Sequence, residues 1–208
     1  MLLVMTDDST PTDALEPAKP AAANAASSRA SAAPSESTDD GLAELLEAAK
    51  AGDQRAFESV YRRTVDAVYG LCLRLTANPS LAEDCVQQTY LQAWRNLRRF
   101  RGDSALSTWL HRIAVNEVRG HFRREARHEV ETAEEEIAGP ASVAGSDIDL
   151  ERAIAELPER GRAVFVLVGV YGYPHEEAAG MLDIAVGTSK AHFHQARRRL
   201  QERLGSSR

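Results

Sequence analysis

The stretch FRGDSALSTWLHRIAVNEVRGHFRR, from Phe100 to Arg124, carries more information about this chain than any other segment. It predicts a loop followed by a helix. Its basic residues are Arg101, Arg112, Arg119, Arg123 and Arg124. Basic groups interleaved with aromatic rings are typical of a groove that holds a nucleic-acid backbone and stacks bases. An amphipathic helix with a solvated arginine face would give the same pattern, so both interpretations stay open on this stretch alone.

A second helix is predicted directly upstream, from about Leu81 to Leu97. The Asn78-Pro79 pair breaks the chain before it, and Ser80 with Glu83 has the spacing of a capping box. The polar face of this helix consists of Asp84, Gln87, Gln88 and Gln92. A face of Asp and Gln can hydrogen-bond a partner, whereas Lys or Glu would serve a merely solvated face. An ordinary polar face remains the alternative.

The C-terminal segment YPHEEAAGMLDIAVGTSKAHFHQARRRLQERL, from Tyr173, predicts two helices joined by a tight turn. The helices are expected over about residues 174–182 and 186–204, with the turn at 183–185. This is the helix-turn-helix pattern, whose second helix enters the major groove of DNA. Two antiparallel core helices would give the same apolar spacing. Basic residues on the second helix favour DNA, namely Lys190, Arg197, Arg198, Arg199 and Arg203.

In this order, the three segments resemble bacterial RNA polymerase sigma factors of the extracytoplasmic-function (ECF) group. The pattern AEDxVQxxxLxAW is similar to the family's polymerase-clamp-binding helix. FRGDSAxxTWLxRIAVN is similar to its promoter-melting and minus-ten segment, and LPERxRxVFxL…EEAAxxLxIxVGTxKxxxxxARRRL to its minus-thirty-five domain. The resemblance covers about residues 40–204 apart from a linker. It implies a subunit that binds core RNA polymerase and directs promoter-specific transcription initiation.

The resemblance also implies roles for three sets of residues. The set implied to dock on the polymerase's largest subunits is Asp84, Gln87, Gln88 and Trp94. The set implied to melt DNA and read the minus-ten element is Phe100, Arg101, Ser104, Leu106, Arg112, Asn116, Arg119, Arg123 and Arg124. The set implied to read the minus-thirty-five element is Thr188, Lys190, Ala191, His192, Gln195, Arg197 and Arg198. Within the second set, the loop would hold a flipped non-template base, and Asn116 would hydrogen-bond a base edge.

The chain departs from the family pattern at four positions. His192 and Gln195 stand where Arg or Lys is usual. Because Gln pairs with adenine and Arg with guanine, we expect a minus-thirty-five sequence unlike the common one. Ser189 stands where the family prefers Val, so weaker packing is expected under the second helix. Asp183 replaces a turn glycine, and Asp tolerates the left-handed conformation.

Charge is distributed unevenly along the chain. The whole sequence has 25 Lys and Arg against 31 Asp and Glu, a net charge of −6. Residues 41–124 carry 13 basic and 9 acidic groups, and residues 150–208 carry 9 and 7. In contrast, residues 125–149 carry 1 basic and 8 acidic groups. Two positive domains are therefore compatible with an acidic chain, because the local field governs association with nucleic acid.

The expected fold class is all-α, with two small helical domains joined by a flexible acidic linker. The segment VFVLVGVY (164–171) has the composition of a buried strand, but its flanks favour helix. A linker of about 25 residues spans tens of ångströms, so the domains need not touch. The expected divisions are a disordered tail (1–39), a sigma region 2 domain (40–124), the acidic linker (125–149) and a sigma region 4 helix-turn-helix domain (150–204).

Neither catalysis nor a cofactor is expected. The sequence has no glycine-rich phosphate loop or nucleophile motif, and its histidines lack the spacing of a zinc site. Cys72 and Cys85 fall at apolar positions, which predicts reduced core thiols in a cytoplasmic protein. No apolar run approaches the about 20 residues of a membrane span.

The partners that the resemblance implies are core RNA polymerase, promoter DNA and an anti-sigma factor. The expected location is the cytoplasm, and a membrane-bound anti-sigma factor would hold the protein at the membrane. Two other classes stay open. One is a helix-turn-helix regulator that acts without being a polymerase subunit, which has no use for the Asp/Gln helix. The other is a protein-only helical interaction module, which does not need Asn116 or the arginines.

Overall fold

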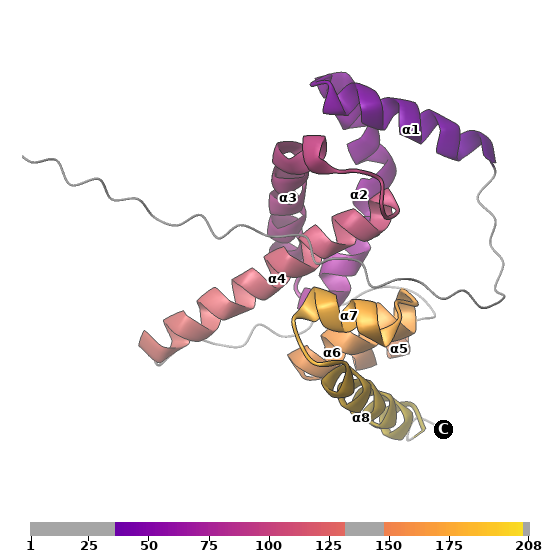
Figure 1. The fold of residues 1–208 in the computed structure, drawn as a ribbon. Helices are drawn as coiled ribbons and strands as arrows, with labels where there is room; N and C mark the ends of the chain where they lie inside the picture. Colours follow the sequence, from indigo (N-terminus) through magenta and orange to yellow (C-terminus); the bar gives the residue numbers. More distant parts are fainter. Residues whose placement is uncertain (1–35, 132–147, 206–208) are drawn as a thin grey trace, which may run out of the picture. The chain divides into compact units, whose positions relative to one another are not determined.

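The computed structural model of the protein describes residues 36–131 and 148–205. Within these ranges every regular element is helical and no strand occurs (Figure 1). The elements are α1 (Glu36–Lys50), α2 (Gln54–Thr76), α3 (Pro79–Asn96), η1 (Leu97–Arg99), α4 (Leu106–Glu131), α5 (Ile148–Ala155), α6 (Glu159–Phe165), η2 (Val166–Val170), α7 (His175–Leu182) and α8 (Val186–Gly205). The all-α prediction is confirmed for the described residues.

Helix α2 is the centre of the N-terminal helices and packs against α1, α3 and α4. It begins at Asp53, whose side chain accepts hydrogen bonds from the backbone N–H groups of Arg55 and Ala56. Such a cap satisfies N–H groups that the first helical turn leaves without partners. The core around α2 consists of Val60, Val68, Leu71, Leu75, Leu97, Leu110 and Val115.

The two cysteines belong to this core. Cys72 on α2 and Cys85 on α3 are buried and unpaired. Burial raises the pKa of the Cys72 thiol to about 12 and that of Cys85 to about 11. Both thiols therefore stay protonated and unreactive at neutral pH, as the prediction of core thiols requires.

The capping box predicted for α3 is wrong. The N-cap is Asn78, whose side-chain oxygen accepts a hydrogen bond from the backbone N–H of Leu81 at 3.2 Å. Pro79 takes the first helical position, where its missing N–H group is not needed. Ser80 therefore lies inside the first turn, so it is not the N-cap that a Ser80–Glu83 capping box requires.

The C-terminal helices form the predicted helix-turn-helix. Asp183 has φ 54° and ψ 51°, so it adopts the left-handed conformation expected of it. The backbone N–H groups of Asp183 and Ile184 both donate to the carbonyl of Ala179, which closes the turn. Upstream, the segment 164–171 is helical as far as Val170, as its flanks predicted, and ends in one π-helical turn over η2.

Two helices are longer than predicted. Helix α4 runs seven residues past Arg124, to Glu131. These residues, EARHEVE, are mostly good helix formers and contain no glycine or proline. Helix α1 begins at Glu36, three residues before the predicted end of the tail. The remaining part of the predicted tail (1–35) and of the linker (132–147) lies outside the described residues.

Candidate nucleic-acid interface

The polar face predicted on α3 is exposed at three of its four residues, and Gln92 is half-buried. Asp84, Gln87 and Gln88 all lie at the surface, opposite the buried Cys85 and Val86. A carboxylate accepts hydrogen bonds, and an amide both donates and accepts them. Because these groups project from the helix into solvent, they are accessible to a partner protein.

An apolar groove lies beside this polar face, between α2 and α3. It has a volume of about 570 Å³, and Gln87 is part of its lining. Three large side chains in it are unusually exposed: Tyr61 at 39%, Leu91 at 45% and Trp94 at 36%. Apolar surface rimmed by polar groups marks a protein-binding site. Sequence reasoning missed Tyr61 and Leu91, although Leu91 follows Gln88 by one turn and so lies on the same face of α3.

The loop after α3 differs from its prediction. Phe100 and Leu106, expected to contact DNA, are only 8% and 9% exposed. The Phe100 ring packs against Trp109 with 5.1 Å between centroids, and Lys50 lies 5.4 Å above it. An amphipathic loop buries its large apolar groups first, so the exposed part of this loop is polar. Arg101 is exposed and Ser104 is half-buried.

Helix α4 presents the predicted basic face. Arg112, Asn116 and Arg123 are exposed and Arg119 is half-buried. Spacings of three and four residues place these four side chains on one face of the helix. Arg124, also exposed, lies next to them. The structure therefore brings together every predicted minus-ten residue that lies on α4, apart from the buried Leu106.

Helix α8 presents the third predicted set. Its exposed members are Thr188, Lys190, Ala191, Gln195, Arg197 and Arg198, whereas His192 is half-buried. Thr188, Ala191 and Gln195 lie along one face by their spacing, which suits a helix that reads base edges in the major groove.

Ser189, the residue beneath α8 that departs from the family pattern, has a hydrogen-bond partner. Ser189 is completely buried, and its hydroxyl lies 2.9 Å from Nδ1 of His175 at the start of α7. The hydroxyl therefore has the hydrogen-bond partner that a buried polar group needs. From the sequence alone, this partner could not be found, because His175 lies 14 residues upstream.

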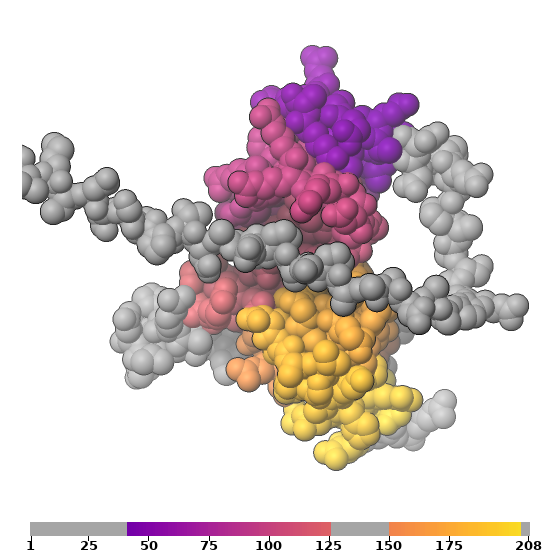
Figure 2. Space-filling model, in the orientation of Figure 1, coloured from indigo at the N-terminus to yellow at the C-terminus, as the bar shows by residue number. Residues whose placement is uncertain are grey.

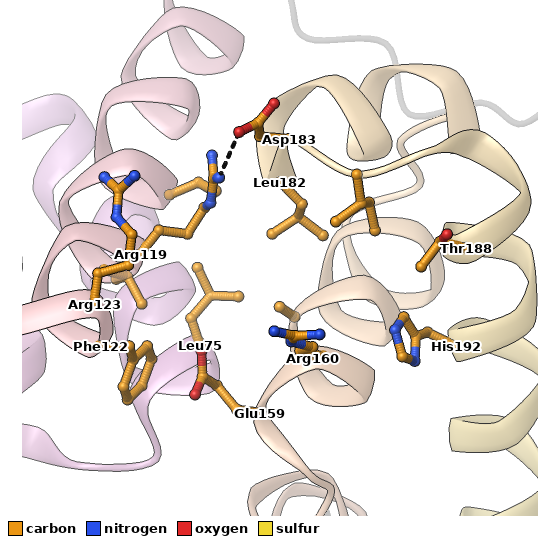
Figure 3. A pocket seen from close by; sticks show the side chains of 14 residues that line it. Leu75, Arg119, Phe122, Arg123, Glu159, Arg160, Leu182, Asp183, Thr188 and His192 are labelled. Carbon is orange, nitrogen blue, oxygen red and sulfur yellow. Dashed lines mark hydrogen bonds and ion pairs between the residues drawn. The ribbon is translucent and has the colours of Figure 1, made fainter. Parts of the chain in front are cut away.

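One cavity joins the second and third sets. It has a volume of about 530 Å³ and is lined by Arg119, Phe122 and Arg123 from α4 and by Thr188 and His192 from α8. Figure 3 shows these side chains on opposite sides of the cavity. Arg119 crosses to the helix-turn-helix, where its guanidinium donates to the carbonyl of Met181 at 3.2 Å and to the carboxylate of Asp183 at 3.3 Å.

The space-filling view shows the C-terminal helices lying against the N-terminal ones (Figure 2). Further polar contacts hold them there. Arg74 on α2 donates two hydrogen bonds, of 2.9 and 2.7 Å, to Glu151 on α5. Arg162 is buried and donates to the carbonyls of Leu75 at 3.0 Å and Thr76 at 3.4 Å. These carbonyls end α2, where the helix dipole favours a cation. The buried charge is thus balanced by backbone oxygens.

A buried histidine completes this interface. Nδ1 of His111 on α4 lies 2.7 Å from the hydroxyl of Tyr173, and the Tyr171 ring packs edge-on with 5.1 Å between centroids. His111 is only 6% exposed. Burial lowers the pKa of His111 from 6.5 to about 4, because the charged imidazolium loses its hydration. His111 is therefore neutral at physiological pH.

Comparison with known protein families matches both helical regions. Residues 60–128 match Sigma-70 region 2, and residues 147–200 match Sigma-70, region 4. No helix among the described residues has both the length and the apolar character of a membrane span.

Three proteins illustrate the similarity. The ECF RNA polymerase sigma factor SigM of Mycobacterium tuberculosis is 39% identical over 166 residues, which cover 78% of this chain and 84% of SigM. The structure of the sigma factor RpoE with the anti-sigma factor NepR from Bartonella quintana is similar with a TM-score of 0.59 and 30% identity, covering 73% of this chain and 98% of RpoE. The structure of CnrH with the cytosolic domain of CnrY is similar with a TM-score of 0.55 and 27% identity, covering 81% of this chain and 100% of CnrH. The chain therefore belongs to the ECF group of RNA polymerase sigma factors.

Proposed function

We propose that this sigma factor divides its work among three surfaces. The α3 surface (Asp84, Gln87, Gln88, Trp94) and the adjoining groove dock on core RNA polymerase. The α4 surface (Arg112, Asn116, Arg119, Arg123, Arg124), with Arg101 and Ser104 of the preceding loop, melts and reads the minus-ten element. The α8 surface (Thr188, Lys190, Ala191, His192, Gln195, Arg197, Arg198) reads the minus-thirty-five element.

The observation that carries this proposal is the chemistry of the three surfaces. The α3 surface is uncharged or acidic and borders an apolar groove, which suits a protein partner. The α4 and α8 surfaces are basic, which suits phosphates. In the loop, the buried side chains of Phe100 and Leu106 anchor the backbone that carries Arg101 and Ser104. We assign no catalytic step to the chain, since nucleotide addition belongs to the polymerase.

Run-off transcription tests this assignment. Core polymerase from the source bacterium is supplied with pooled genomic promoter fragments, with and without the protein. We expect transcripts that depend on the protein and share an upstream motif. DNA binding without transcripts or core association would instead support a helix-turn-helix regulator. Association with neither core nor DNA would support a protein-only module.

A change at Gln195 should alter the minus-thirty-five code. With Gln195→Arg, we expect the preferred base at one position to change from adenine to guanine, with about 1–3 kcal/mol of discrimination. Binding-site selection with holoenzyme measures this preference. Gln201→Arg is the matched control, because it makes the same substitution at an exposed α8 position more than one and a half turns beyond Gln195 and outside the α8 surface. An unchanged selected sequence for Gln195→Arg would contradict a reading role for this residue.

Promoter binding should require the C-terminal helices to leave α2 and α4. The two promoter elements are separated by about 25 base pairs, or about 85 Å at about 3.4 Å per pair. Arg119 and His192, which belong to different DNA surfaces, instead line one cavity of about 530 Å³. One arrangement therefore cannot serve both elements. We propose that the docked form is a resting state, and that binding of core and promoter replaces its contacts.

The folded protein should lose stability in mild acid. The low pKa of His111 means that the folded state binds fewer protons than the unfolded state between pH 6.5 and about 4. Stability is then unaffected above pH 6.5 and falls as the pH drops towards 4, by up to about 3 kcal/mol. Urea unfolding at several pH values measures this. The His111→Asn variant keeps a polar side chain that does not titrate, so its free energy of unfolding should fall less steeply with decreasing pH. Equal slopes would exclude His111 as the cause.

We also propose that an anti-sigma factor restrains this chain. The support is by similarity, because the related RpoE structure contains the anti-sigma factor NepR. The proposed function also favours a cytoplasmic location, because core polymerase and the chromosome lie in the cytoplasm. Co-purification of the tagged chain from the source bacterium, followed by identification of the bound proteins, tests for such a partner.

A further inference from the structure

His175, at the start of α7, contacts two residues of the recognition helix α8 that lie one turn apart. Nδ1 of His175 lies 2.9 Å from the Ser189 hydroxyl, and the His175 ring packs edge-on against Phe193 with 5.5 Å between centroids. Ser189 and Phe193 are four residues apart and so lie one above the other on the inner face of α8. Contact at two levels restrains both the depth and the rotation of the helix.

The second level is held from the opposite side. Phe193 stacks on Phe165 of α6, with 5.7 Å between centroids and 16° between the ring planes. Gly169 faces this stack, and a Cβ atom there would lie 3.3 Å from both rings. Phe193 is therefore in contact with Phe165 on one side and His175 on the other, which limits how far α8 can shift.

The residues that read DNA are adjacent to these anchors. Lys190 and Ala191 directly follow Ser189, and His192 directly precedes Phe193. Any shift of Ser189 or Phe193 is transmitted to them within the same helical turn, since the helix backbone is rigid at this scale. The geometry of the reading face thus depends on the position of Ser189.

We infer that His175 is a positioning residue for minus-thirty-five recognition, acting through Ser189 and Phe193; this inference rests on the proposed function. The physical reason is the buried hydroxyl. An apolar residue at position 189 would tolerate small displacements of α8, because dispersion contacts are not directional. A fully buried hydroxyl must keep its partner, so the helix is held where Nδ1 of His175 is within reach. The pair makes the orientation of α8 more specific than packing alone.

The test is binding-site selection over randomised minus-thirty-five positions, with the full chain assembled on core polymerase. The variants are His175→Ala, Ser189→Ala, Ser189→Val and the double variant His175→Ala/Ser189→Val. We expect His175→Ala to lower discrimination between the selected and altered minus-thirty-five sequences about three- to tenfold. Discrimination at the minus-ten element should not change. Gln201→Ala, at an exposed position near the end of the same helix and outside the α8 surface, is the control.

The double variant separates positioning from simple loss of packing. Because a valine side chain needs no hydrogen-bond partner, the double variant should recover part of the discrimination that His175→Ala loses. Ser189→Ala removes only the hydroxyl oxygen and keeps the assay informative if His175→Ala unfolds, which thermal melting detects. An equal loss of affinity for all sequences, or unchanged discrimination in both His175→Ala and Ser189→Ala, would overturn the inference. Absence of transcripts with the unmodified chain would instead refute the proposed function.

Discussion

Replacing Leu91 and Trp94 together by alanine is expected to lower the affinity for core RNA polymerase by about 30-fold or more. Both side chains are exposed at the α2–α3 groove, beside the polar Gln87 and Gln88. A large aromatic side chain at the centre of an interface commonly contributes about 2 kcal/mol or more on truncation. Titration of labelled protein against core polymerase measures the affinity directly.

A matched truncation distinguishes this effect from general damage. Leu204→Ala removes a leucine of similar exposure, 37%, near the end of α8 and far along the chain from the groove. It should leave core affinity within about twofold, since isolated surface substitutions have small effects. Trp94 also packs on Phe57, with 4.8 Å between ring centroids, so thermal melting must accompany the titration. Core affinity that is unchanged in a folded double variant would exclude the groove as the docking site.

Reversing the charge of Arg74 is expected to release the C-terminal helices from α2. Arg74→Glu would place two carboxylates where Arg74 and Glu151 now share hydrogen bonds of 2.9 and 2.7 Å. The side chains are only 31% and 24% exposed, so water screens the pair incompletely. Loss of the pair together with the new repulsion should disfavour docking by about 2 kcal/mol or more. Energy transfer between dyes at exposed positions of α1 and α8 measures the docked population.

The exchanged pair is the control for this experiment. Arg74→Glu/Glu151→Arg keeps both charges and reverses their positions, so it should restore docking in part. Arg62→Glu changes the charge of another exposed α2 arginine, whose partner Glu58 lies on the same helix, and should leave docking intact. If the docked form is a resting state, Arg74→Glu should also bind promoter DNA more readily in the holoenzyme. Docking that persists in the single variant would contradict the role given to this ion pair.

The helices and their order follow from local patterns in the sequence. Local patterns predicted α3, α4 and the helix-turn-helix, and the left-handed Asp183 was anticipated from its residue type. These features depend on contacts within a few residues, such as those between successive helical turns. The start of α3 was wrong because Asn78 and Ser80 are both suitable N-caps, and only the fit of the first turn decides between them.

The surfaces were predicted less evenly. The predicted polar residues of α3, α4 and α8 are exposed where the sequence placed them, apart from the half-buried Gln92, Arg119 and His192. Phe100 is instead buried, because whether an aromatic ring beside a basic loop faces solvent depends on the neighbouring Trp109. The groove at Tyr61 and Leu91 requires α2 and α3 to lie together, which no spacing within one helix reveals.

By itself, the sequence determined the helical class, the family and most of the polar residues that are exposed on α3, α4 and α8, since these depend on local periodicity and residue chemistry. Only the tertiary structure decided which groups pair across the chain. Arg74 reaches Glu151 over 77 positions, Arg162 reaches Leu75 over 87, and His111 reaches Tyr173 over 62. Such contacts arise when whole helices pack. The shared cavity and the His175–Ser189 seat therefore became visible only in the folded molecule.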